Sequence, residues 1–292
     1  MSTLWNEIKL KMLHSGSRIS LLIGINLIVF LLINIPSVFE WLFLGHNPTI
    51  IAHYADEYLD LPANFSKLSS RFWTPLTYMF MHAGPLHIIF NMLWLFWIGQ
   101  IFEEYLGNKR TIGLYLMGGL TGALFFLLGF NFIPVLEQMN ANANVVVVGA
   151  SAAVMAVLIA TATLLPDYTM VLMLFGPVKL KWLAITFVIL DFLMIAGSNP
   201  GGELAHLGGA LFGFVYIKQL QRGNDWVGFF TKLFSKKAAL KVVSKSNTKS
   251  NGNTPRQEDI DRILDKISQT GYESLSRQEK EILFRASKDN EG

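Results

Sequence analysis

The sequence has no cysteine and is poor in charged residues over most of its length. The absence of cysteine excludes a disulfide scaffold, thiol catalysis and thiolate metal sites. Asp, Glu, Lys and Arg make up 22 of the first 222 residues, about 10%, against roughly 25% in ordinary soluble domains. That is too little charge to cover a surface exposed to water, so a purely soluble enzyme is excluded. The last 70 residues carry 23 charged side chains and have a soluble composition.

Long apolar stretches account for the missing charge. A membrane-spanning helix needs about 17–25 mostly apolar residues, because only a helix satisfies its own backbone hydrogen bonds in lipid. Six stretches of about this length predict an all-α membrane protein with six transmembrane helices, at residues 19–35, 86–102, 112–136, 145–165, 182–197 and 203–220. A further apolar stretch, residues 168–178, is too short to span the membrane and is interrupted by Gly176-Pro177. It predicts an interfacial strand or turn.

The basic residues indicate the orientation of the spans. Three basic residues precede the first span, and nine Lys and Arg between Lys218 and Arg256 follow the last one, against the single acid Asp225. The opposite side has only Lys67 and Arg71. By the positive-inside rule both termini are cytoplasmic. The net charge of +3 is therefore explained by membrane orientation and by attraction to anionic lipid, and no nucleic-acid partner is expected.

The composition divides the chain into a cytoplasmic N-terminal segment, a six-span domain, a basic flexible linker and a cytoplasmic tail, at residues 1–17, 18–222, 223–256 and 257–292. In the tail, apolar residues repeat at helical spacing and stop near Gly271. Ser276 and Glu279 have the spacing of a capping box that opens a second helix. The tail is therefore expected to be a small helical hairpin with a docking or stabilising role.

Polar side chains inside membrane spans are costly, so each is a candidate for function. His87 and Asn91 are four residues apart and share a face of the second span. Ser151 lies in the fourth span after a β-branched run, and His206 lies in the sixth. Close packing of these two spans would bring the serine hydroxyl within hydrogen-bond reach of the imidazole. Small residues that permit such packing are Ala152, Ala156, Ala160, Gly209 and Gly213.

The depths of these residues in the membrane favour a pair of catalytic side chains. At 1.5 Å per residue, Ser151 lies about 8 Å below the outer boundary of a hydrocarbon layer about 30 Å thick, and His206 lies at a comparable depth. Asp191 is about nine residues into the fifth span, near mid-membrane, and by this count is poorly placed to orient His206. We expect a Ser–His dyad, and for Asp191 a structural hydrogen bond within the bundle.

The motifs around these residues resemble those of the rhomboid intramembrane serine proteases. The resemblance covers about residues 18–220 and rests on His82-Ala-Gly-Pro-Leu-His87-Ile-Ile-Phe-Asn91, Gly99-x3-Glu103-x3-Gly107, Gly149-Ala-Ser151 and Ala205-His206-x2-Gly209-x3-Gly213. It implies a six-helix rhomboid bundle in which Ser151 is the nucleophile and His206 its general base. It also implies that His87 and Asn91, with the Ser151 backbone N–H, bind the oxyanion.

The resemblance further implies supporting residues, a substrate class and a location. His82 and Glu103 are similar to structural positions that brace the loop between the first two spans, and Gly149, Gly209 and Gly213 support the site. The expected reaction is hydrolysis of peptide bonds in or near the transmembrane segments of single-span membrane proteins, with no cofactor. The C-terminal hairpin resembles an extension of some bacterial rhomboids, which favours a bacterial inner membrane with the active site open to the outer side.

Three positions depart from the family pattern. Ala152 stands where a glycine usually follows the serine, and Met155 stands where a tyrosine often lies beneath the histidine. Trp73-Thr74 replaces a frequent Trp-Arg pair in the first loop. None of the three removes a reacting group, but each bears on rate or substrate preference.

The β-branched run before Ser151 predicts how a substrate is held. A protease needs its peptide extended, and a β-branched segment that ends near the nucleophile offers an edge for strand addition. We expect the substrate to pair with Val146, Val147 and Val148.

Other functions compete with this hypothesis. A non-catalytic rhomboid-like protein that binds transmembrane clients would keep the fold without hydrolysis. A small-solute channel or transporter would show internal repeats or paired broken helices, which are not evident. His82 and His87 could suggest a metal pair, but they are five residues apart with Gly84-Pro85 between them, whereas a helical zinc pair needs a spacing of four and an intervening glutamate. No metal is expected.

Overall fold

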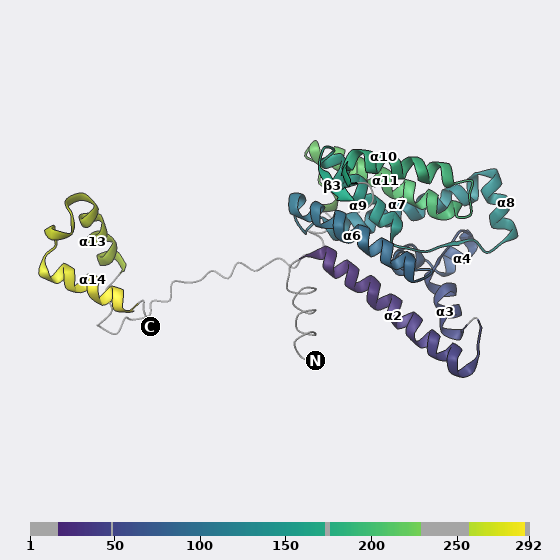
Figure 1. The fold of residues 1–292 in the computed structure, drawn as a ribbon, viewed down its shortest axis with the longest axis horizontal. Helices are drawn as coiled ribbons and strands as arrows, with labels where there is room; N and C mark the ends of the chain where they lie inside the picture. The colour runs from purple at the N-terminus through teal and green to yellow at the C-terminus, as the bar shows by residue number, and fades with distance from the viewer. Residues whose placement is uncertain (1–16, 48, 173–175, 229–256, 290–292) are drawn as a thin grey trace. The chain divides into compact units, whose positions relative to one another are not determined.

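The computed structural model of the chain describes residues 17–47, 49–172, 176–228 and 257–289. It divides into two compact units, residues 1–235 and residues 236–292. The first unit holds the predicted spans and the second holds the predicted hairpin (Figure 1). Nearly all of the predicted N-terminal segment and most of the predicted linker lie outside the described residues.

The first unit contains a helix that overlaps each of the six predicted spans. These helices are α2 (Arg18–Leu44), α6 (Pro85–Leu106), α7 (Thr111–Phe132), α9 (Ser151–Leu164), α10 (Leu180–Met194) and α11 (Pro200–Gln221). Among the described helices, α2, α6 and α7 are the three that are long and apolar enough to cross a membrane. α9 and α10 have 14 and 15 residues, and α11 is rich in glycine. The structure therefore supports a mostly helical membrane protein, and the number of six spans stays a prediction.

The ends of three helices differ from the predicted ends. α2 continues past Pro36, which lies inside the helix, and ends before Gly45, where φ is 68°. α7 ends at Phe132 because a proline opens the short helix α8 (Pro134–Asn142). α9 begins only at Ser151, since β-branched residues before it form a strand. Local backbone chemistry sets these ends more closely than hydropathy does.

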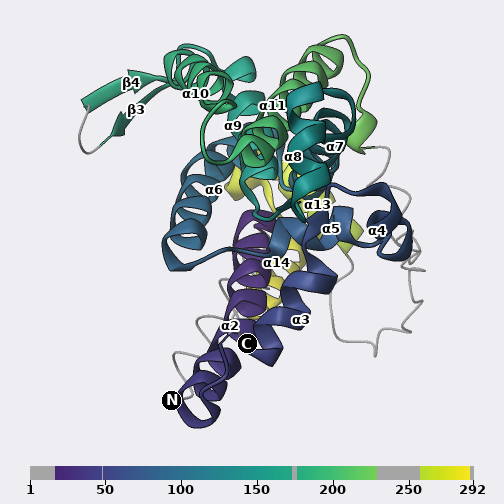
Figure 2. The ribbon, with the colours of Figure 1, turned by 90° about the vertical axis from the view of Figure 1, so that its right-hand side faces the viewer.

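Two short antiparallel sheets accompany the helices. β1 (Leu61–Pro62) pairs with β2 (Val146–Val147), so that Leu61 lies opposite Val147 and Pro62 opposite Val146. β3 (Thr169–Leu172) and β4 (Gly176–Lys179) pair with each other and project beside α10 (Figure 2). The second pair confirms the strand predicted within residues 168–178.

Short helices connect α2 to α6. They are α3 (Ile50–Leu59), α4 (Phe65–Ser70), α5 (Thr74–Thr77) and the 3₁₀ turn η2 (Tyr78–Phe80). α3 runs alongside the C-terminal end of α2 (Figures 1 and 2). Arg71 forms an ion pair with Glu57, and the indole N–H of Trp73 donates to the Tyr58 carbonyl oxygen at 2.8 Å. These contacts fasten the segment before α6 to α3.

α9 is the central helix of the first unit. It packs against α6, α7, α10 and α11, and every residue from Ala152 to Ala162 is buried. The approach of α11 depends on glycine, because a Cβ at Gly209 would clash with the carbonyl oxygen of Ala152, and a Cβ at Gly213 with that of Ala156. The predicted packing of small residues between these two helices is confirmed.

Glu103, near the end of α6, caps the start of α2. Its Oε1 accepts hydrogen bonds from the backbone N–H groups of Arg18 (2.8 Å) and Ile19 (3.0 Å), and its Oε2 accepts one from the Ser17 hydroxyl (2.7 Å). The loop between α2 and α6 begins at the other end of α2, so the expected role of Glu103 in bracing that loop was wrong. The carboxylate instead ties the two helices together and offsets the positive end of the α2 dipole.

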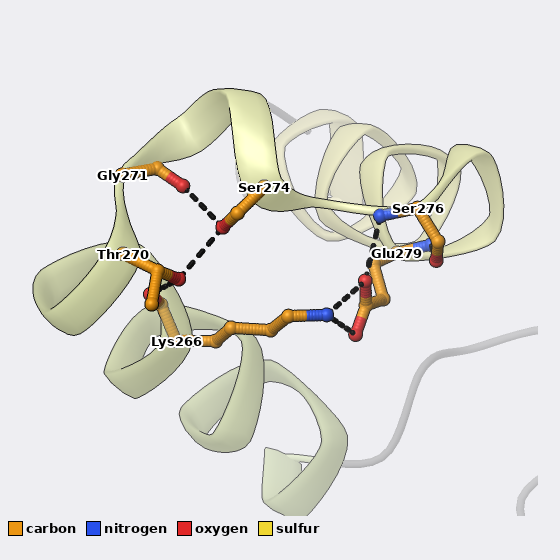
Figure 3. A network of polar contacts seen from close by, with 6 residues as sticks. All are labelled: Lys266, Thr270, Gly271, Ser274, Ser276 and Glu279. Atoms are coloured by element: carbon orange, nitrogen blue, oxygen red, sulfur yellow. Dashed lines mark hydrogen bonds and ion pairs between the residues drawn. The ribbon is translucent and has the colours of Figure 1, made fainter.

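The second unit is a helical hairpin (Figure 3). α13 (Gln257–Thr270) ends before Gly271, where φ is 80°, and α14 (Arg277–Asp289) follows the 3₁₀ turn η3 (Tyr272–Ser274). The predicted capping box is present: the Ser276 N–H donates to the Glu279 carboxylate at 2.7 Å, and the Glu279 N–H donates to the Ser276 hydroxyl at 3.3 Å.

Glu279 also joins the two helices of the hairpin. The Lys266 ammonium donates to both of its carboxylate oxygens, at 2.9 and 3.0 Å (Figure 3). The Lys266 and Ser276 hydrogen bonds lower the pKa of Glu279 to about 2. One carboxylate therefore caps α14 and anchors it to α13.

Gly213→Ala tests the contact between α9 and α11. The added methyl group would meet the Ala156 carbonyl oxygen, and α9 would have to shift, so we expect a loss of about 1–3 kcal/mol of stability. The thermal unfolding midpoint of the purified protein in detergent measures this loss. Leu211→Ala, at an exposed position of the same helix, is the control and should lower the midpoint less. A Gly213→Ala midpoint equal to that of the wild type would contradict the proposed packing.

Candidate active site

Ser151 is the first residue of the central helix α9. It follows β2, and Gly149 between them has a φ of 126°, a conformation that favours glycine. The Gly149 N–H donates to the Tyr78 carbonyl oxygen at 2.9 Å, which fixes the turn. The first N–H groups of α9 lack intrahelical partners, as at every helix start. Ser151 therefore presents its hydroxyl beside a set of backbone donors.

His87 lies against this turn because Gly149 has no side chain. A Cβ at Gly149 would lie 2.8 Å from both Cε1 and Nε2 of His87 and 3.4 Å from Ser151 Oγ. The Ala83 N–H donates to His87 Nδ1 at 3.4 Å, so the neutral ring carries its proton on Nε2. The structure thus brings a ring N–H donor of His87 close to Ser151.

Asn91 lies one turn further along α6. It is buried, and its amide donates to the His87 carbonyl oxygen at 3.0 Å. One of the two amide hydrogens is therefore used within its own helix. The contacts of the described residues do not join Asn91 directly to Ser151.

The His82 ring packs against the ring of His87. The two rings meet edge to face with centroids 5.1 Å apart. His82 is buried, and among the described residues neither of its nitrogens has a hydrogen-bond partner. Burial lowers the pKa of His82 to about 4, so the ring stays neutral at physiological pH. It acts as a packed aromatic group in the loop before α6.

Ala152 and Ala205, the neighbours of Ser151 and His206 in the chain, both pack against Gly122 of α7. A Cβ at Gly122 would lie 2.6 Å from the Ala152 Cβ and 2.7 Å from the Ala205 carbonyl oxygen. The same space accommodates the methyl group that distinguishes Ala152 from glycine.

No hydrogen bond joins Ser151 to His206 among the described contacts. The structure thus packs α9 against α11, but the Ser151 hydroxyl and the His206 imidazole are not hydrogen-bonded to each other.

Asp191 contacts His206 directly. The His206 Nδ1 lies 3.1 Å from Asp191 Oδ1. The expectation that Asp191 is poorly placed to orient His206 was therefore wrong. α10 ends at Met194 and α11 begins at Pro200, so both side chains lie within two turns of one short connection, at the same level. A depth counted from the cytoplasmic end of a single span did not include this connection.

Glu203 is a further acidic residue at His206 that the sequence analysis missed. Its Oε2 lies 3.6 Å from His206 Nδ1, and both acids are buried. The available signal was the spacing of three residues, which places Glu203 and His206 on one face of α11. The ligand atoms of Asp191, Glu203 and His206 all lie within 4.8 Å of one another, close enough to hold a metal ion.

A small pocket lies beside β1 and β2. Its lining includes Asp56, Asp60, Lys67, Arg71 and the exposed Val146. Asp60 is buried, and its Oδ1 has no hydrogen-bond partner among the described residues. Burial, with a smaller contribution from the Asp56 charge, raises the pKa of Asp60 to about 8. The pocket therefore places a neutral carboxyl group beside the strand pair that precedes Ser151.

One edge of β2, the strand predicted to bind substrate, is already paired with β1 in the protein. The Ala63 N–H donates to the Val145 carbonyl oxygen at 2.9 Å, in register with the Leu61–Val147 pair. In an antiparallel ladder this directs the backbone groups of Val147 toward β1 and those of Val146 away from it. Val147 is therefore not free for strand addition, whereas the opposite edge of β2 is unpaired among the described strands.

Comparison with protein families finds a Rhomboid domain at residues 69–222, just over half of the chain. Residues 251–289 match a family of unknown function, DUF6576.

Two curated proteins from Arabidopsis thaliana are similar to the chain. It is 31% identical over 164 residues to RHOMBOID-like protein 12, mitochondrial, and 26% identical over 171 residues to Rhomboid-like protein 16, chloroplastic. These matches cover 53% and 56% of this chain and 48% and 53% of the relatives. The chain thus spans about half the length of the curated relatives it matches.

Asp60→Asn tests the buried carboxyl beside β1. The pKa of Asp60 is about 8 in the folded protein against an ordinary value of 3.8, so between these pH values the unfolded chain releases a proton that the folded chain keeps. Rising pH across this window destabilises the wild type but not the amide variant. The difference in unfolding midpoint should therefore grow from about pH 4 to about pH 8 in favour of Asp60→Asn. Asp167→Asn, an exposed acid paired with Lys179 and Lys181, should show no such gain. A difference that is constant with pH would contradict the raised pKa.

Proposed function

The chain belongs to the rhomboid family, and on that premise we propose that it is an intramembrane serine endopeptidase that hydrolyses single-span membrane proteins. The observation that carries the proposal is the position of Ser151 at the start of α9, against which α11 packs with His206. The helices of the first unit would form six spans, with both termini on the cytoplasmic side and the site open to the outer side.

The proposed reaction uses a serine and an imidazole. A serine is a weak nucleophile until a base removes its proton, and an imidazole titrates near neutrality and can return that proton to the leaving amine. Ser151 Oγ attacks the scissile carbonyl, and His206 Nε2 accepts its proton. A side-chain rotation closes the open Ser151–His206 contact, as catalytic hydrogen bonds often tighten only when substrate binds.

Three donors are proposed to stabilise the oxyanion. They are Nε2–H of His87, the second amide hydrogen of Asn91 and the backbone N–H of Ser151. The support is the placement of the His87 ring over Gly149, next to Ser151 Oγ. Each fixed donor aimed at developing negative charge contributes about 3–4 kcal/mol where water is scarce.

Substrate is proposed to bind as a strand on the unpaired edge of β2. A transmembrane helix hides its carbonyl groups, so the substrate must unwind before it is cut. The backbone groups of Val146 face the edge that β1 leaves unpaired, and Val148 would continue this edge by alternation if the strand is extended on binding. Val148 lies three residues before Ser151, so the added strand would lead toward the nucleophile.

The membrane of residence is also a proposal. The distribution of basic residues and the C-terminal hairpin favour a bacterial inner membrane, with lipid as a partner of the basic tail. The two plant relatives carry the words mitochondrial and chloroplastic in their names.

One observation favours a second function, a rhomboid-like protein that binds transmembrane clients without cutting them. Ser151 and His206 share no hydrogen bond among the described contacts. A protein of this kind would retain the helix packing and the strand edge and would lack hydrolysis.

Labelling with a fluorophosphonate probe separates the two functions. The probe bonds to an activated serine oxygen with loss of fluoride, so the wild type should be labelled and Ser151→Ala should not. His206→Ala removes the base and should slow labelling by about 10²-fold or more. Ser37→Ala, which alters a serine bonded within α2, is the control and should label like the wild type. Equal labelling of wild type and Ser151→Ala would refute the protease.

Val146→Pro tests strand addition. Proline removes the N–H that faces the unpaired edge of β2, so kcat/KM for a tagged transmembrane substrate should fall about tenfold or more. Labelling of Ser151 by the small probe should persist, because the probe does not bind as a strand. Val146→Ala, which keeps the N–H, is the control. An unchanged kcat/KM for Val146→Pro would exclude this edge as the substrate site.

A further inference from the structure

We propose that Asp191, assisted by Glu203, is a positioning residue that holds His206 in the tautomer able to deprotonate Ser151. This inference rests on the proposed function, since it assigns the role of base to His206. In place of the expected dyad, the proposed site has Ser151, His206 and Asp191, and Glu203 is a second acid that can contact His206.

The geometry fixes which ring nitrogen faces the acids. His206 Nδ1 lies 3.1 Å from Asp191 Oδ1 and 3.6 Å from Glu203 Oε2. An ionised carboxylate only accepts hydrogen bonds, so Nδ1 must carry the proton. In the neutral ring Nε2, on the opposite side, is then unprotonated and able to accept the Ser151 proton. Without an acceptor at Nδ1 the neutral ring could carry its proton on either nitrogen.

The acids also counter the charge that forms in the reaction. When Nε2 takes the Ser151 proton, His206 becomes a half-buried cation, which is costly unless paired. Asp191 and Glu203 are both buried, and no described Lys or Arg forms an ion pair with either. The carboxylate that faces Nδ1 is therefore available to the imidazolium. The Nδ1 proton stays on the ring, and the acid accepts it only as a hydrogen bond.

The two acids reach His206 from different elements. Asp191 lies on α10, whereas Glu203 lies three residues before His206 on the same helix and keeps its position relative to the ring. The shorter distance makes Asp191 the main partner, and Glu203 is the acceptor that remains if Asp191 is removed. Asp191 Oδ2 has no hydrogen-bond partner among the described residues, so one of its oxygens makes the contact with the imidazole.

Asparagine and alanine at position 191 separate positioning from packing. An amide can donate to Nδ1 and hold the proton on Nε2, the tautomer that cannot act as a base, whereas alanine leaves Nδ1 to Glu203. Asp191→Asn should therefore lower kcat by about 10²- to 10⁴-fold with KM within about threefold, and Asp191→Ala should lower kcat less. A purely structural role gives the reverse order, because asparagine fills the same volume.

A carboxylate that contacts another histidine provides the control. Glu40 is buried in α2, and its Oε1 lies 2.9 Å from His46 Nδ1. Glu40→Gln alters a carboxylate–histidine contact outside the site and should lower kcat far less than Asp191→Asn. The double variant Asp191→Ala/Glu203→Gln should fall below Asp191→Ala, because it removes both acceptors. Higher kcat for Asp191→Asn than for Asp191→Ala would overturn the proposal.

Two measurements on the full chain do not depend on turnover. The ¹⁵N spectrum of histidine-labelled protein, assigned with His206→Ala, should show protonated Nδ1 and unprotonated Nε2, and Asp191→Asn should reverse them. Protonated Nε2 in the wild type would overturn the proposal. So would a stoichiometric metal ion in the purified protein that is lost in Asp191→Asn, together with activity abolished by a chelator. Absence of Ser151 labelling in the wild type would instead refute the proposed function, and the spectrum would still decide the tautomer.

Discussion

The close contact between α9 and α11 is the constraint on which the rest of the first unit depends. Lipid is as apolar as leucine, so helices in a membrane gain little from burying apolar surface and associate through close packing. Gly209 and Gly213 let α11 rest on the carbonyl groups of Ala152 and Ala156. The same contact sets the separation of Ser151 from His206. The geometry of the candidate site therefore depends on glycine residues at the interface between the two helices.

The polar groups of the site form a chain of neighbours across several elements. The His82 ring meets that of His87, whose Nε2 approaches Ser151 across Gly149, and His206 meets Asp191 at the far end. Burial makes each unsatisfied polar group costly, so such groups are expected to gather where they can serve one another. Among the described contacts, Ser151 and His206 are the neighbouring members of this series that do not contact each other. In the proposed reaction the substrate carbonyl is attacked at this position.

Features that depend on local chemistry could be predicted from the sequence. The capping box of Ser276 and Glu279 and the packing of Gly209 against Ala152 follow from spacing alone, and both are present. Features that depend on how distant segments meet could not be predicted. Glu103 caps a helix that begins 85 residues earlier in the chain, and β2 pairs with a strand from the first loop. Asp191 and His206 meet because the connection between α10 and α11 is short, which a count of depth along one span does not reveal.

The weak attachment of α2 has a mechanical consequence. The protein holds this helix mainly near its start, through Glu103 and the buried residues Ile19 and Leu22, while most large apolar side chains from Leu31 to Leu44 are exposed. Few protein contacts therefore fix the tilt of its second half, and a change in bilayer thickness would be accommodated there. α3 rides on that half and leads directly into β1, the strand paired with β2. A thicker or thinner bilayer would thus act through α3 on β1 and, through the strand pair, on β2, which ends four residues before Ser151. Lipid composition is in this way coupled to the site.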